Sequence, residues 1–250
     1  MNKNTLIYEV QNLKKVSGQR NILQIGRLQI HKGTIYGIVG PVGSGKSSLL
    51  KHLSGLEKPT EGTLLYDANE FKTSMFGKLL APEDVKYVSL SESIKGDRVS
   101  RYIKQMHGKR SEEIRKQYFN TGFQRFMWDQ PINSLSMGEQ VWVKLINAVE
   151  SDPRVLIIEH YGEYLDEDLL HDINRRLRRM NKNLGTTIVL STSDQSKLKR
   201  LASVLIFLDK GHVAKIRSSN QRGGQQGPQR QRNKRGDSRR RGQQRQRRNR

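Results

Sequence analysis

Gly40-Pro41-Val42-Gly43-Ser44-Gly45-Lys46-Ser47 is the stretch of sequence that decides the fold. It matches the pattern G-x-x-x-x-G-K-[ST] at every position, and it stands between an apolar run at 34–39 and a helix-forming segment at 47–53. This pattern, placed between a strand and a helix, is typical of a phosphate-binding loop (P-loop). The glycines let successive N–H groups point at phosphate oxygens, and the start of the helix adds the positive end of its dipole.

The loop predicts a nucleoside triphosphate site that uses Mg²⁺. We expect the Lys46 ammonium to reach the β- and γ-phosphates and the Ser47 hydroxyl to ligate Mg²⁺. The alternative is a glycine-rich turn with a solvent-exposed lysine, which the strand–loop–helix context disfavours. The predicted nucleotide-binding residues are Gly40, Pro41, Val42, Gly43, Ser44, Gly45, Lys46, Ser47 and Ser48.

Three further apolar runs, at 155–158, 187–190 and 204–208, resemble the one that precedes the loop. Each is short and rich in β-branched residues, which is typical of strands buried on both faces of a parallel sheet. The segments 136–150 and 165–180 are helical in pattern and separate the runs. This alternation predicts an α/β fold with a P-loop NTPase core and a mostly parallel sheet.

Two other kinds of structure are predicted around this core. The N-terminal stretch to about Ile30 and the segment Thr60–Tyr66 have the pattern of an antiparallel β-ribbon. Residues 91–134 are polar and mostly helical in pattern, so we expect a small helical subdomain there. Together with the core, these parts form one predicted domain over 1–216.

Residues 217–250 differ from the rest of the chain in composition. They hold twelve Arg and one Lys against one Asp, slightly more than half of the net charge of +22, and almost no apolar side chain. Such a segment cannot bury enough surface to offset its ordering entropy, so a disordered Arg/Gln/Gly-rich basic tail is predicted. Its charge favours RNA or anionic membrane lipid as a partner. A solubilising tail without a specific partner is the third possibility.

The composition also excludes several classes of site. The chain of 250 residues has no cysteine, which excludes a disulfide framework, a thiolate metal site and thiol catalysis. Its longest aliphatic or aromatic run, Val204–Leu208, is far short of the roughly 20 residues that span a bilayer. Met1–Asn4 leads into no signal-type apolar stretch. We therefore expect a cytoplasmic protein that meets a membrane only through a partner or a surface contact.

Many families use such a loop, and a second stretch distinguishes between them: Leu135-Ser136-Met137-Gly138-Glu139-Gln140. It resembles the signature sequence of ABC (ATP-binding cassette) ATPases, usually written L-S-G-G-Q, with Met137 and Glu139 as variants. Ser136 and Glu139 also match the S-x-x-E pattern of a capping box, which starts a helix. The alternative interpretation of this stretch is an ordinary helix cap.

Other stretches agree with the same family. Gly55–Gly62 resembles the segment after the loop helix, Leu165-Asp166 the end of the D-loop, and Asp209–Gly211 the turn after a late strand. The resemblance covers about residues 5–215 and is most similar to exporter ATPases. It implies ATP and Mg²⁺ as cofactors, a second ABC subunit and a separate transmembrane subunit as partners, and a position on the cytoplasmic face of a membrane.

The sequence departs from the family where hydrolysis is carried out. Glu159 stands where the family has its metal-binding Asp, and His160 stands where it has its catalytic Glu. Ser193 replaces the switch histidine, and Leu90 replaces the Q-loop glutamine. Val16 replaces the aromatic residue that usually stacks on adenine.

These departures predict ATP binding with weak or absent hydrolysis. Glu159 can still hold a Mg²⁺-bound water, and a neutral His160 can accept a proton near pH 7. Losing the base that orients the attacking water typically costs about 10²- to 10⁴-fold. The candidate catalytic positions are therefore Glu159, His160 and Ser193, and the candidate metal ligands are Ser47 and Glu159.

The resemblance implies composite sites, in which the loop of one subunit faces the signature of another. The residues expected to complete a partner's site are Leu135, Ser136, Met137, Gly138 and Glu139. The leading predicted function is the ATP-binding subunit of an ABC transporter or related membrane complex. A soluble ATP-binding factor acting on RNA or ribosomes through the tail is the alternative, and a regulatory pseudo-ATPase is the third. The single cassette favours the transporter, because translation-type members usually carry two.

Overall fold

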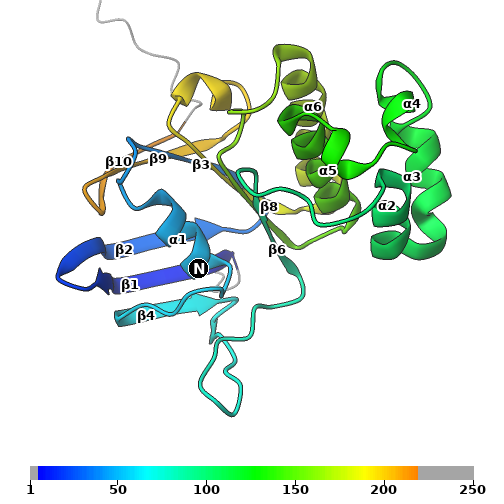
Figure 1. Cartoon of the computed structure of the whole chain (residues 1–250). Coiled ribbons are helices and arrows are strands. Elements are labelled where there is room, and N and C mark those ends of the chain that lie inside the picture. Colours follow the sequence, from blue (N-terminus) through cyan, green and yellow to red (C-terminus); the bar gives the residue numbers. More distant parts are fainter. Residues whose placement is uncertain (1–4, 219–250) are drawn as a thin grey trace, which may run out of the picture. The chain divides into compact units, whose positions relative to one another are not determined.

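The computed structural model describes residues 5–218 of the chain. Its central element is a six-stranded sheet in the order β10-β9-β3-β8-β7-β6 (Figure 1). All neighbouring pairs are parallel except β9 and β10, which form an antiparallel hairpin. This confirms the mostly parallel sheet. The strands are β3 (Ile35–Val39), β6 (Val85–Ser89), β7 (Val155–Glu159), β8 (Thr187–Thr192), β9 (Val204–Asp209) and β10 (His212–Ser218).

A second, four-stranded antiparallel sheet has the order β2-β1-β4-β5. Its strands are β1 (Leu6–Ser17), β2 (Arg20–His31), β4 (Glu61–Tyr66) and β5 (Asn69–Glu70). The long β1–β2 hairpin and β4 confirm the antiparallel ribbon that the N-terminal pattern predicts. The hairpin buries Ile7, Tyr8, Val10 and Leu13 of β1 and Leu23, Ile25, Leu28 and Ile30 of β2, as expected for strands with one face on the core.

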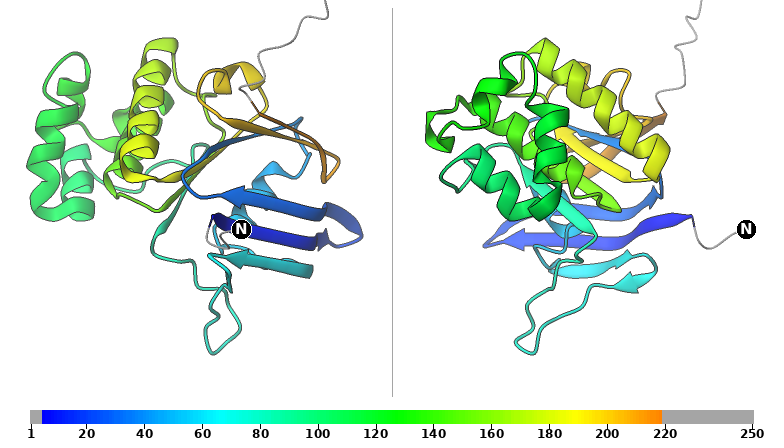
Figure 2. Two further views of the ribbon diagram at one scale, coloured as in Figure 1. Left: turned by 180° about the vertical axis from the view of Figure 1, so that it is seen from behind. Right: turned by 90° about the vertical axis from the view of Figure 1, so that its right-hand side faces the viewer.

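Three helices pack against the two sheets: α1 (Lys46–Leu53), α5 (Met137–Glu150) and α6 (Glu167–Leu184). Helix α1 buries Leu49, Leu50 and Leu53 in the core that also contains the inner residues of β1 and β2. Helices α5 and α6 bury their apolar faces in a second core, on the other face of the six-stranded sheet. Figure 2 shows the antiparallel sheet and the helices α5 and α6 on opposite sides of that sheet. The parallel strands are therefore covered on both faces, which explains their continuous apolar sequences.

Short helices fill the region between β6 and α5. They are α2 (Val99–His107), η1 (Gly108–Arg110), α3 (Ser111–Tyr118), α4 (Gln124–Met127) and η2 (Ile132–Ser134), and η3 (Gln195–Leu198) follows β8. The first of these helices begins at Val99, eight residues after the start of the segment with helical pattern, because residues 90–98 form turns and extended chain. In the described part of the chain, no helix combines the length and the apolar character needed to cross a bilayer.

The predicted start of the basic tail requires one correction. Arg217 and Ser218 belong to β10, where Arg217 pairs with Leu205 and Ser218 with Val204. Composition assigns both residues to the tail because they are polar, whereas backbone pairing with β9 holds them in the sheet. The other tail residues, 219–250, lie outside the described part of the chain. The RNA or lipid partner predicted for the tail therefore stays a prediction.

Candidate nucleotide-binding site

The phosphate loop leaves β3 at Gly40 and enters α1 at Lys46. Gly43 and Gly45 have φ values of 79° and 95°, in the left-handed region that favours glycine. A Cβ on Gly45 would also lie 2.6 Å from Cδ2 of Leu23, and one on Gly40 would lie 2.6 Å from Oγ of Ser44. The glycine spacing of the motif is therefore a steric requirement of this loop.

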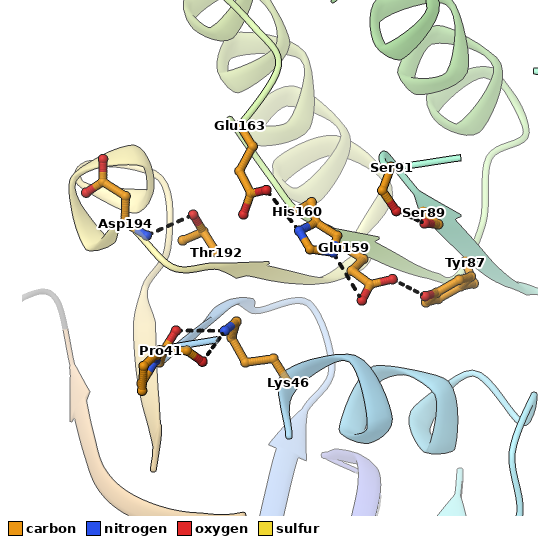
Figure 3. A network of polar contacts seen from close by, with 11 residues as sticks. Pro41, Lys46, Tyr87, Ser89, Ser91, Glu159, His160, Glu163, Thr192 and Asp194 are labelled. Atoms are coloured by element: carbon orange, nitrogen blue, oxygen red, sulfur yellow. Dashed lines mark hydrogen bonds and ion pairs between the residues drawn. The ribbon is translucent and has the colours of Figure 1, made fainter. Parts of the chain in front are cut away.

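Lys46 folds back over the loop that it follows. Its Nζ donates to the carbonyl oxygens of Gly40 at 2.7 Å and Pro41 at 2.9 Å (Figure 3). Partial burial lowers the pKa of the Lys46 ammonium, and the carboxylates of Glu163 and Glu159 oppose that shift. The ammonium is thus held at the mouth of the loop, next to the first turn of α1, whose N–H groups have no partner within the helix.

A cavity of about 570 Å³ opens in front of the loop, within the range of small-molecule sites. Of the predicted nucleotide-binding residues, the structure places Val42, Gly43, Gly45, Lys46, Ser47 and Ser48 in its wall. Gly40, Pro41 and Ser44 do not line it. Gly40 and Pro41 accept hydrogen bonds from Lys46, and the Ser44 Oγ is buried without a hydrogen-bond partner. The other lining residues are Lys15, Ser17, Arg20, Ile22, Lys51, Glu57, His160, Glu163, Ser191, Thr192 and Ser193.

Glu159 ends β7 close to this cavity, and its carboxylate is almost fully buried. It accepts a hydrogen bond from the Tyr87 hydroxyl of the neighbouring strand β6 (Figure 3). Burial raises the pKa of Tyr87, and the bond to Glu159 raises it further, so the phenol stays protonated and able to donate. Tyr87 therefore fixes the direction in which Glu159 points.

His160 follows Glu159 with a φ of 58°, an uncommon backbone conformation for a residue other than glycine. Its Nδ1 lies 2.9 Å from Oε2 of Glu163, and its Nε2 lies 3.6 Å from Oε1 of Glu159. The imidazole is thus placed between two carboxylates at the edge of the cavity (Figure 3). Sequence reasoning gave no role to Tyr87 or Glu163. Glu163 follows the apolar run at 155–158 by five residues, whereas Tyr87 lies in β6, which none of the predicted apolar runs includes.

The remaining departures from the family pattern divide into two groups. Ser193 lines the cavity beside Ser191 and Thr192. Leu90 is fully buried in the helical core and offers no polar group to the site. Val16 is absent from the cavity wall, where its neighbours Lys15 and Ser17 stand instead.

The signature residues lie on α5 and its cap, and none of them lines the cavity. The Ser136 Oγ accepts from the Glu139 N–H at 3.3 Å, and the Ser136 N–H donates to the Glu139 carboxylate at 2.7 Å. The predicted capping box is therefore present. A Cβ on Gly138 would lie 2.8 Å from the carbonyl oxygen of Tyr164, so this glycine lets the helix start against the loop after β7.

The fit of a metal ion rests on few side chains. Within residues 5–218, no group of three or more His, Asp or Glu side chains is arranged to hold a metal. Mg²⁺ keeps several waters and takes only one or two protein ligands together with phosphate oxygens. Ser47 in the cavity wall and Glu159 close to it are the residues that would hold Mg²⁺ arriving with a nucleotide, and the Tyr87 hydroxyl donates to one oxygen of Glu159.

Comparison with known proteins agrees with this geometry. Residues 23–160 match the family model described as ABC transporter. The chain is 28% identical over 215 residues to the methionine import ATP-binding protein MetN of Cutibacterium acnes, covering 82% of this chain and 58% of MetN. It is 27% identical over 231 residues to the probable sulfate/thiosulfate import ATP-binding protein CysA of Chlorella vulgaris, covering 85% of this chain and 91% of CysA.

A solved structure shows the same fold. It is that of cbiO1 from Clostridium perfringens, described as part of the ABC transporter complex cbiONQ. Its TM-score is 0.72 at 22% sequence identity, and the match covers 86% of this chain and 89% of cbiO1. The antiparallel sheet, the parallel sheet and the helices of this chain together therefore form a fold that is already known.

Proposed function

This chain belongs to the ABC transporter family, and from that premise we propose that it is the ATP-binding subunit of a transport complex. The observation that carries the proposal is the phosphate loop, in which Gly43 and Gly45 take left-handed conformations directly before α1. The loop faces a cavity of about 570 Å³ whose wall contains Lys46, Ser47 and Ser48. Main-chain N–H groups, a lysine and a hydroxyl are the groups that bind a triphosphate with Mg²⁺.

We propose further that this subunit hydrolyses ATP weakly. Glu159 is turned toward Tyr87, and His160 stands where the family resemblance implies a catalytic carboxylate. Ser193 offers a short hydroxyl in the place of an imidazole, and Leu90 has no polar group and is buried in the core. Each change weakens the orientation or deprotonation of an attacking water and leaves the phosphate loop intact.

The signature at the start of α5 supports a role toward a second subunit. Ser136, Gly138 and Glu139 lie outside the wall of the chain's own cavity. We propose that they complete the site of a second ABC subunit, and that both associate with a separate transmembrane subunit at the cytoplasmic face of a membrane. MetN and CysA are import proteins by name, whereas the signature resembles that of exporters, so we assign no direction of transport to this chain.

Binding of labelled ATP to the full chain with Mg²⁺ tests the proposal. Lys46→Ala is expected to weaken ATP binding at least about tenfold, because a charge-assisted contact to phosphate is lost. Lys58→Ala is the matched control, since Lys58 is exposed and lies outside the cavity wall. If Lys46→Ala and Lys58→Ala bind ATP equally well, the proposed site is wrong.

A further inference from the structure

The cavity in front of the phosphate loop has an unusual wall for a site that takes a nucleotide base. Among the described residues that line it, none is Phe, Tyr or Trp, whereas Lys15, Arg20, Lys46 and Lys51 are cations. A base recognised by stacking needs a flat aromatic surface, and a phosphate chain needs positive charge and N–H donors. The wall offers the second kind of recognition.

Val16 lies outside the cavity wall because β1 keeps its regular alternation at this point. The register shift beyond Lys15 leaves Ile22 of β2 unpaired and inserts no residue into β1, and the Val16 N–H donates to Oγ1 of Thr60 at 3.1 Å. Successive side chains of a strand point to opposite faces, so Lys15 and Ser17 face the cavity together. The hairpin therefore turns a cation and a small hydroxyl toward the nucleotide, and an aromatic residue at position 16 would not reach the cavity.

Arg20 comes to the phosphate loop from the other side of the same hairpin. It is the first residue of β2, and its Nη2 lies 3.8 Å from the position that a Cβ on Gly43 would take. Gly43 is in the left-handed part of the loop, where backbone N–H groups turn toward the bound anion. The guanidinium thus stands over the loop, and its planar fork of N–H donors suits phosphate oxygens.

The neighbouring cation is already engaged. The Nζ of Lys15 lies 2.7 Å from the Glu57 carboxylate, which partly neutralises it. Within residues 5–218, no Asp or Glu forms an ion pair with Arg20, so its charge is available to a ligand. Arg20 and Lys46 then face the same loop from two elements, the hairpin and the start of α1.

We propose that this site recognises the polyphosphate of its ligand, with Arg20 as a second phosphate-binding cation beside Lys46, and discriminates little between bases. The ligand class is the nucleoside triphosphates in general. The inference rests on the proposed nucleotide site and specifies which part of the nucleotide that site recognises. It assigns Arg20 a role that the loop motif does not contain.

Competition binding to the full chain tests the inference. In this assay ATP, GTP, CTP, UTP and inorganic tripolyphosphate are each titrated, with Mg²⁺ present, against bound labelled ATP. We expect the four nucleotides to bind within about threefold of one another and of tripolyphosphate, because no aromatic side chain in the described wall is available to stack on a base, and such stacking is worth about fivefold in affinity or more. Arg20→Gln should weaken all four by a similar factor of about tenfold, because a charge-assisted contact to phosphate is removed.

Arg27→Gln is the matched control, because Arg27 is an exposed residue of the same strand outside the cavity wall. It should change no affinity by more than twofold, and thermal melting shows whether either variant is less stable. A preference for ATP of more than tenfold over CTP and UTP overturns the inference. So does an Arg20→Gln variant that binds like Arg27→Gln, or one that loses affinity for ATP alone.

A second pair of variants tests the geometry of the wall. Ser17→Tyr places an aromatic ring in the cavity and should tighten the binding of nucleotides by about fivefold relative to inorganic tripolyphosphate, whereas Val16→Tyr should leave this ratio unchanged. The reverse outcome overturns the assignment of the two positions. The proposed function fails separately: if the wild-type chain binds no nucleotide, both proposals are wrong, whereas ATP binding that depends on Lys46 but selects adenine contradicts only this inference.

Discussion

The phosphate loop and the carboxyl ends of β7 and β8 face the same cavity, and they differ in what they retain of the family pattern. The loop keeps every residue of its motif, with Gly43 and Gly45 in the conformations that the motif requires. Opposite it, Glu159, His160 and Ser193 all depart from the residues that the family resemblance implies. Under the proposed function, binding and hydrolysis of a nucleotide depend on separate parts of this fold.

The physical reason lies in the groups that each part uses. The loop binds through main-chain N–H groups, so a local sequence with glycines in the right places is sufficient. Hydrolysis needs side chains from different strands at defined positions, and each can be replaced without unfolding the sheet. A chain can therefore lose the second activity and keep the first.

Restoring the family's carboxylates at positions 159 and 160 should have the largest effect, which we expect on the rate of ATP hydrolysis. In the double variant Glu159→Asp, His160→Glu, a carboxylate can again act as base, and we expect ATP hydrolysis to rise by about 10²- to 10⁴-fold. Phosphate release from the purified chain measures the rate, and the single variants serve as controls. ATP affinity should change little, because the loop is untouched.

A high rate in the wild-type chain breaks the comparison between the two regions. If the unmodified protein alone hydrolyses ATP at roughly 1–100 s⁻¹, the range of typical kinases, then Glu159 and His160 support full catalysis and the proposed weak hydrolysis is wrong. If the double variant hydrolyses no faster than the wild type, residues beyond these two, such as Leu90 or Ser193, limit the reaction.

Damage to the loop should have the next largest effect. Gly45→Val is expected to lower ATP affinity by about 100-fold or more, because the φ of 95° is unfavourable for valine and the side chain meets Leu23 and the Ile22 carbonyl. Gly77→Val is the control, since Gly77 has a φ of 72° but no atom within 4 Å of its Cβ position, and it lies outside the cavity wall. Equilibrium binding of labelled ATP compares the two. Equal losses of ATP affinity in the two variants would show that the strained backbone of the phosphate loop is not specifically required for binding.

Removal of the Tyr87 hydroxyl should change stability and Mg²⁺ dependence, and by less than the variants above change hydrolysis or ATP affinity. Tyr87→Phe leaves a buried oxygen of Glu159 without its donor, which costs about 1–3 kcal/mol and lowers the melting temperature by several degrees. Tyr118→Phe is the matched control, because the Tyr118 hydroxyl donates to Glu150 in the same way far along the chain from the loop. Thermal unfolding measures both variants.

The two tyrosine variants should differ only in their response to Mg²⁺. With Oε2 of Glu159 released, Tyr87→Phe is expected to bind ATP with a Mg²⁺ dependence shifted by a few-fold, whereas Tyr118→Phe should match the wild type. An identical Mg²⁺ dependence in the two variants would mean that Glu159 takes no part in metal binding.

Much of the fold could be predicted from local sequence. The short β-branched runs predicted the parallel strands β3, β7, β8 and β9 but not β6, and the Ser136–Glu139 pattern predicted a capping box that the structure contains. The position of Val16 could not be predicted, because the face of β1 that meets the cavity depends on how the antiparallel sheet packs beside the phosphate loop. The bond between Tyr87 and Glu159 depends on which strands become neighbours, and nothing in either segment alone shows this.

The sequence by itself determined the phosphate loop and the family, because both depend on residues within a few positions of one another and on backbone conformations that only glycine adopts readily. Tertiary structure alone decided that Arg20 reaches Gly43, that Tyr87 holds Glu159 and that Glu163 meets His160. Contacts of this kind depend on the pairing, register and twist of strands. Those are set when the two cores pack, and no short segment encodes them.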